Sequence, residues 1–146
     1  MTRFALAAAA VLAVAAGVSM WRDARPAPDA VAVLDIDPAR DMGRVRVGDA
    51  VLVPCTVGNP TATPVEVFGI PAGCGGDGAC FAVASPGPRF FVPARGTVEV
   101  VIKVSVVAPG PFAVTVPVYY NGGGLRTLRL AITGIGVPAD SPPAGH

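Results

Sequence analysis

The residues best able to do chemistry are the three cysteines, two of which lie close together in the sequence. Cys74 and Cys80 flank the run Gly75-Gly76-Asp77-Gly78-Ala79. Because glycine tolerates the dihedral angles of tight turns, this run can bring the two sulfur atoms within bonding geometry. We interpret the pair as a structural disulfide. Closing so small a loop would stabilise the fold by roughly 2–3 kcal/mol in the chain-entropy model.

Other hypotheses for the cysteines stay open at this point. Cys74 and Cys80 could form a redox-active thiol pair, or contribute to a metal site, although two thiolates alone do not complete a set of four ligands. Cys55 lies on the apolar face of a predicted strand, and we expect it to be a buried free thiol that packs as a small hydrophobic residue. The sequence also leaves open a bond from Cys55 to either of the other two.

The remaining polar residues offer no catalytic set. The only histidine, His146, ends a proline-rich tail in which no scaffold could orient it, which argues against serine or cysteine triads and histidine-bound metals. Asp35, Asp37 and Asp41 are interpreted as solvated residues at strand ends rather than as a calcium site. The run Gly122-Gly123-Gly124 lacks the lysine of a phosphate loop and predicts a hairpin turn. We expect no enzymatic activity, no metal and no cofactor.

The composition limits the class of partner. The chain has 146 residues, of which 14% are charged, and its net charge is +1. Such a balance gives no basic field to attract nucleic acid. The 18 glycines and 16 prolines stand between short valine-rich runs, which is typical of a turn-rich all-β domain.

The first residues are predicted to be a targeting element. Residues 4–20 carry no charge and follow Arg3, and a membrane-spanning helix needs about 20 apolar residues. The stretch Val14-Ala15-Ala16 resembles a signal-peptidase site, whereas Trp21 and Arg22 would suit an interfacial anchor. Residues 1–21 are therefore predicted to form a hydrophobic helix that serves either as a cleaved signal peptide or as an N-terminal membrane anchor. Both alternatives place the domain in the periplasm or at the cell surface.

The segments that position the cysteines follow in order. We expect residues 22–30 to form a Pro/Ala linker, residues 31–137 the folded domain, and residues 138–146 a disordered proline-rich tail. A first strand is expected over residues 31–37. Residues 42–48 are expected to be a connection, and residues 80–84 and 89–92 short strands, the former at a sheet edge. Strong period-two alternation predicts longer strands over 51–57, 98–106, 112–120 and 125–137, with another beginning at Val65.

About seven short strands with turn signals every eight to twelve residues predict an all-β fold, an immunoglobulin-like sandwich of two antiparallel sheets. The Cys…Trp…Cys spacing of antibody domains is absent, because the only tryptophan is Trp21. Tyr119 and Tyr120 are expected on opposite faces of their strand, and an exposed Tyr119 would suit a contact surface.

Several short motifs, taken in order, carry a resemblance to a known family. They are Met42-Gly43, Gly48, Gly58-Asn59, Pro64-Val65, Gly73-Cys74-Gly75, Pro93-Ala94-Arg95-Gly96, Gly110, Asn121, Leu128-Arg129-Leu130 and Thr133-Gly134. Over residues 32–137 the chain resembles the bacterial exported domain of unknown function 1573 family. That family is similar to the immunoglobulin-like domains of the ciliary proteins Hydin, ASPM and SPD-2, and more distantly to major sperm protein.

The chain also departs from the family pattern. The family's Phe-Gly pair is Met42-Gly43 here, its Asn-x-Gly turn is Asn59-Pro60-Thr61, and its Cys-Gly-Cys motif is reduced to Cys74-Gly75-Gly76. Any role of the family's cysteine pair is therefore not carried over. The resemblance implies an immunoglobulin-like fold and an exported location, with no known enzymatic activity.

The sequence thus predicts a non-catalytic, structural or protein-interaction module that contacts an unknown protein of the cell envelope. Two alternatives are a thiol–disulfide or electron-transfer module that uses Cys74 and Cys80, and a periplasmic chaperone-like binder that donates a strand. Most of this functional prediction rests on analogy at the level of the fold.

Overall fold

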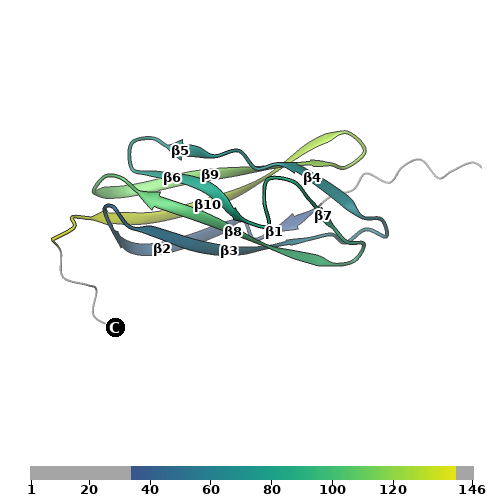
Figure 1. Ribbon diagram of the computed structural model, residues 1–146, viewed down its shortest axis with the longest axis horizontal. Coiled ribbons are helices and arrows are strands. Elements are labelled where there is room, and N and C mark those ends of the chain that lie inside the picture. Colours follow the sequence, from purple (N-terminus) through teal and green to yellow (C-terminus); the bar gives the residue numbers. More distant parts are fainter. Residues whose placement is uncertain (1–33, 141–146) are drawn as a thin grey trace, which may run out of the picture. The chain divides into compact units, whose positions relative to one another are not determined.

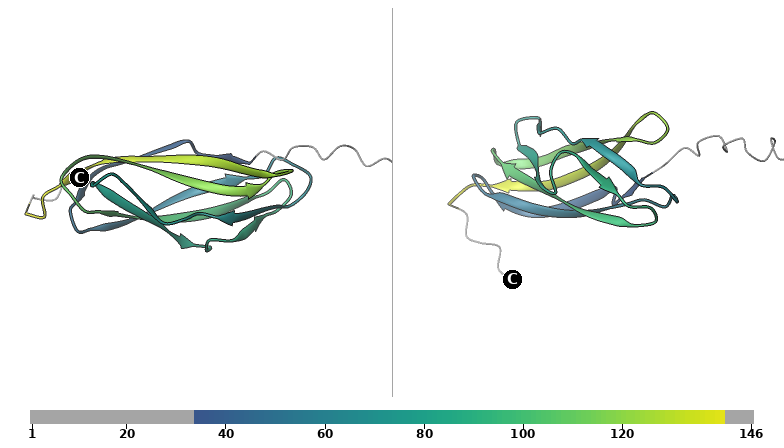
Figure 2. Two further views of the ribbon diagram at one scale, coloured as in Figure 1. Left: turned by 90° about the horizontal axis from the view of Figure 1, so that it is seen from above. Right: turned by 45° about the vertical axis from the view of Figure 1, so that its right-hand side comes forward.

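The computed structural model describes residues 34–140, which form an all-β sandwich of two five-stranded sheets (Figures 1 and 2). Sheet A has the strand order β1-β3-β8-β6-β5, and sheet B the order β2-β10-β9-β4-β7. The strands are β1 Asp35–Ile36, β2 Ala39–Arg46, β3 Ala50–Gly58, β4 Val65–Gly69, β5 Gly73–Gly75, β6 Ala79–Ser85, β7 Phe90–Val92, β8 Thr97–Val106, β9 Gly110–Asn121 and β10 Leu125–Val137.

The core lies between the sheets and is formed by alternate residues of the long strands. Val100, Ile102 and Val104 of β8 are buried, and so are Leu130 and Ile132 of β10. Burying an aliphatic side chain of this size contributes about 1.5–3 kcal/mol, so this alternation fixes which face of each strand points inward. The predicted immunoglobulin-like sandwich is confirmed, with seven strands of at least five residues and three shorter ones.

The chain passes between the two sheets seven times, and prolines stand at the crossings from β1 to β2 and from β6 to β7. β1 pairs antiparallel with β3 in sheet A, and after Asp37-Pro38 the chain continues as β2, which runs parallel to β10 in sheet B. Likewise β6 belongs to sheet A, and after Pro86-Gly87-Pro88 the chain continues as β7 beside β4 in sheet B. Because proline cannot donate to a ladder, prolines suit the points at which pairing with one sheet ends.

Three local predictions are wrong. Residues 42–48 are not a connection, because residues as far as Arg46 belong to β2. Gly43 has a φ of +65° beside a register shift in the β2–β10 ladder, and this irregularity hides the strand's alternation. No strand was predicted at residues 73–75, which form β5, and β6 lies between β8 and β5 rather than at the edge of the sheet.

The predicted targeting segment (residues 1–21), the linker (22–30) and His146 lie outside the described residues. Within residues 34–140 no helix is long and apolar enough to cross a membrane.

Candidate functional site

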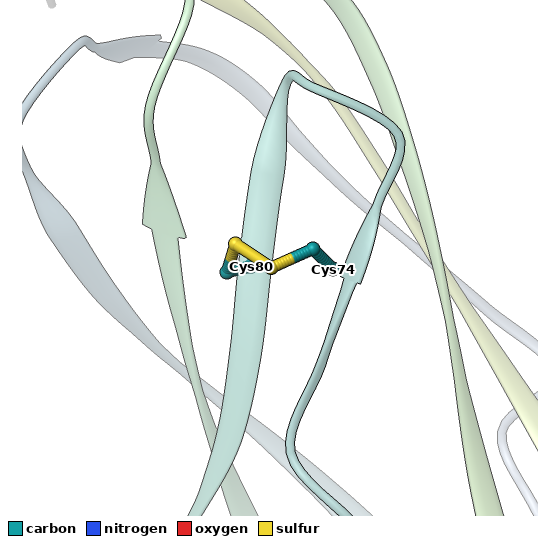
Figure 3. The surroundings of a disulfide bond; sticks show 2 residues. All are labelled: Cys74 and Cys80. Atoms are coloured by element: carbon teal, nitrogen blue, oxygen red, sulfur yellow. A yellow bond between two sulfur atoms is a disulfide. The ribbon is translucent and has the colours of Figure 1, made fainter.

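Cys74 and Cys80 lie directly opposite each other on β5 and β6, and a disulfide joins them (Figure 3). Their Cα atoms are 3.9 Å apart. Cys80 also pairs with Ser105 of β8. Since residues directly opposite in a ladder share a face, the bond lies on the outer face of sheet A, away from the core. Cys74 is exposed and Cys80 is half-buried.

The strand that carries Cys74 lies against an open edge of sheet B. β4 pairs with β9 only at Tyr119 and Tyr120, so within the described chain no strand of sheet B pairs with this edge of β9 over residues 110–118. The space that a Cβ atom at Gly75 would need is occupied by the carbonyl oxygen of Ala113. A Cβ at Gly78 would lie 2.8 Å from the Cβ of Phe112. The disulfide hairpin, defined as residues 73–80, therefore covers this edge through backbone contacts that only glycine permits.

Cys55 is the free cysteine and is buried in the core. Its Sγ donates a weak hydrogen bond to the carbonyl oxygen of Val100, at 3.3 Å. Burial raises the pKa of the thiol above its ordinary value. The side chain therefore stays neutral and acts as a packing residue, and neither of the sequence's alternative bonds to Cys55 is formed.

Asn59 is a fully buried polar residue that ties two loops together. Its side-chain Nδ2 donates to the carbonyl oxygens of Thr63, Val92 and Pro93 at 2.8–3.2 Å. Its Oδ1 accepts from the backbone and hydroxyl groups of Thr61 at 3.0 and 2.7 Å. Buried polar groups need such partners, and here they fix the end of β7 against the loop that precedes β4.

β7 and β4 carry aromatic side chains on the outer face of sheet B. Phe91 is 64% exposed and lies opposite Glu66, and Phe68 is 39% exposed. Tyr119 lies opposite Gly69, where a Cβ atom would touch the tyrosine ring at 3.4 Å. We call Phe68, Phe91 and Tyr119 the aromatic patch. An ion pair lies on the same face, in which Nε of Arg89 lies 2.7 Å from Oε1 of Glu66, the residue opposite Phe91.

A groove of about 260 Å³ lies on another side of the sandwich, between β2 and β3. β1 pairs with β3 only at Val57 and Gly58, so within residues 34–140 the rest of β3 has a free edge on this side. The groove is lined by Arg40, Asp41, Met42, Val51, Leu52, Val53 and Pro54.

The acidic residues singled out from the sequence do not converge. Asp37 pairs with Arg40 at 2.7 Å, and Asp41 accepts a hydrogen bond from the backbone of Gly43. Over the described part of the chain, no group of three or more potential metal-ligating side chains is close enough to hold an ion.

Of the aromatic patch, Tyr119 was expected from the sequence as an exposed residue, whereas Phe68 and Phe91 were not. The doublet Phe90-Phe91 indicates one exposed ring, because adjacent residues of a strand point to opposite faces. Phe90 packs against the core and Phe91 faces solvent.

No family model matches the sequence, and no curated protein matches it. Solved structures do match. The ASH/PapD-like domain 7 of human CEP192 superposes with a TM-score of 0.57 at 16% identity, covering 80% of this chain and 93% of that one. A protein of unknown function from Porphyromonas gingivalis W83 matches with a TM-score of 0.51 at 16% identity, over 77% of this chain and 51% of that one.

A protease also shares the fold. VesB of Vibrio cholerae matches with a TM-score of 0.53 at 18% identity over 70% of this chain, but the match spans only 31% of the protease chain. At these identities the likeness shows an immunoglobulin-like β-sandwich fold, and it says nothing about activity.

Proposed function

We propose that this chain is a non-catalytic, exported interaction domain of the cell envelope, and that it contacts a partner protein through the aromatic patch. The observation that carries the proposal is the exposure of Phe91 and Phe68 on one face of one sheet. Large aromatic side chains are enriched at the centres of protein interfaces.

The geometry of the patch suits a preformed contact surface. Both phenylalanines stand on paired strands, and the Asn59 hydrogen bonds hold the carbonyl group of Val92, the residue that follows Phe91. The rings are therefore presented by rigid backbone, which lowers the entropy lost on binding. The Arg89–Glu66 ion pair adds charged groups beside the rings, because Glu66 lies directly opposite Phe91.

Export and family membership are parts of the same proposal. The charge-free segment at residues 4–20 supports export, and so does the disulfide, since such bonds persist in oxidising compartments. The shared immunoglobulin-like fold supports membership of the domain of unknown function 1573 family.

Site-specific photo-cross-linking in intact cells tests the proposal. A photoreactive amino acid at Thr127, which lies opposite Tyr119 on the outer face of sheet B, would sample the edge of the patch. The same probe at Thr56, which faces outward from sheet A opposite Glu99, is the matched control. We expect a discrete protein adduct from position 127 and none from position 56. Equal labelling from both positions, or no adduct from position 127, would contradict the proposal.

A second candidate function is favoured by the free edge of β3. An extended segment of a partner could pair with residues 50–56 and place apolar side chains in the groove beside Met42 and Leu52. This mode predicts an adduct from position 56 rather than from position 127, so the same experiment separates the two candidates.

A further inference from the structure

We propose that the Cys74–Cys80 disulfide is a redox-sensitive lock that holds β5 over the open edge of β9. Reduction by a dithiol would release β5 and uncover residues 110–118 of β9, while the rest of the sandwich stays folded. This inference concerns regulation and does not depend on the aromatic patch.

Apart from the disulfide, β5 is held mainly by a short backbone ladder with β6 that spans three residue pairs. The strand has three residues, Gly73, Cys74 and Gly75. Glycine has a low strand propensity and no side chain to pack. The Phe81 ring lies against Gly73, and the bond to Cys80 is the one covalent tie that β5 makes to β6.

The neighbouring segments are held independently of the disulfide. β6 pairs with β8 from Ala79 to Ser85. The carbonyl oxygen of Gly78 accepts hydrogen bonds from the backbone groups of Val107 and Ala108, at 2.9 and 3.3 Å. On the other side, Ile70 is buried in the core. Loss of the disulfide would therefore free the segment between Ile70 and Gly78 and leave both of its ends anchored.

In the described part of the chain, β5 and β9 lie in close contact, but no ladder of backbone hydrogen bonds joins them. Gly75 lies against the carbonyl oxygen of Ala113, but within residues 34–140 no ladder pairs β5 with β9. Once β5 moves away, the backbone groups of β9 on this side face solvent. An uncovered strand edge is a template for pairing with another chain.

The bond is open to a reductant, because Cys74 is exposed on the outer face of sheet A. A thiolate of the dithiol attacks the sulfur of Cys74 and forms a mixed disulfide, and the sulfur of Cys80 leaves as a thiolate and takes up a proton. The second thiol of the dithiol then displaces Cys74. Two electrons and two protons pass to the cysteine pair, and the dithiol becomes a disulfide.

Hydrogen exchange of the full chain tests the lock. We would compare the oxidised protein with the protein reduced by dithiothreitol under native conditions, and with the variant Cys74→Ser/Cys80→Ser. Exchange is expected to be at least tenfold faster over residues 71–77 and clearly faster over 110–118. At labelling times too short for global unfolding to contribute, it should be unchanged over residues 131–137 of β10, which are paired with β2 and largely with β9. In the serine variant, dithiothreitol should change nothing.

Each other outcome overturns the proposal. Unchanged protection over residues 71–77 after reduction would show that β5 is held without the bond. Faster exchange over 71–77 with 110–118 unchanged would show that β5 is no cover. Loss of protection in all strands, β10 included, would show that the disulfide stabilises the whole fold and not β5 alone. Resistance of the native protein to reduction by dithiothreitol would rule out a redox response.

Discussion

The carbonyl oxygen of Ala113 occupies the space in which a side chain at Gly75 would begin. Together with the contact between Gly78 and Phe112, this contact joins the disulfide hairpin of sheet A to the free edge of β9 in sheet B. Only glycine therefore fits at position 75 while the two sheets stay packed on this side. Substitution of Gly75 tests this.

Substituting Gly75→Ala should destabilise the fold by about 1–3 kcal/mol, because the new methyl group overlaps backbone that cannot move easily. Gly58→Ala is the matched control, since a Cβ there meets only ordinary contacts at 3.8 and 3.9 Å. Urea denaturation would show the difference. Equal stability of the two variants would mean that the hairpin does not press on β9.

Removing the disulfide with Cys74→Ser/Cys80→Ser should lower the free energy of unfolding by roughly 2–3 kcal/mol, because the unfolded chain is no longer cross-linked. The measurement is the urea midpoint with and without reductant. Reductant should lower the midpoint of the wild-type protein to that of the variant and leave the variant unchanged. A wild-type midpoint that does not respond would contradict a stabilising bond.

Substituting Asn59→Ala should cost roughly 2–3 kcal/mol, because it strips hydrogen-bond partners from buried backbone groups. Asn59→Asp should cost more at neutral pH, since a carboxylate would face the carbonyl oxygens of Thr63, Val92 and Pro93. Asn121→Ala, which removes one exposed contact to Gly124, is the control and should have little effect. If the aspartate variant were as stable as the wild type, the assigned amide orientation would be wrong.

The buried Cys55 thiol should make stability depend on alkaline pH. Its pKa is raised in the folded state by burial, so above about pH 8.5 the unfolded chain loses a proton that the native state keeps. The thiol's contribution to stability should therefore be full below that pH and decline as the pH rises further. Denaturation should show that the wild type exceeds Cys55→Ala in free energy of unfolding by less at pH 10 than at pH 7. A constant difference would contradict this linkage.

The long strands could be predicted from the sequence because their alternation is strict, and β8 and β10 bury the residues that the pattern indicated. β2 and β5 could not, for a physical reason. Gly43 breaks the alternation of β2, and β5 is mostly glycine, so neither has a periodic side-chain pattern to detect.

The candidate site was predictable only in part. The Cys74–Cys80 pairing follows from local chain flexibility, because the six-residue separation is short. The contact of Gly75 with Ala113 depends on long-range packing between the two sheets, which no local pattern encodes. The pairing of Phe91 with Glu66 likewise depends on the change of sheet between β6 and β7.

The most direct test of the interaction surface is the cross-link from position 127 compared between the wild-type patch and Phe68→Ser/Phe91→Ser. Because both rings are exposed, the double variant should keep its urea midpoint nearly unchanged. We predict that the partner adduct falls at least tenfold in the variant. An adduct of undiminished yield from an equally stable variant would contradict binding through the aromatic patch.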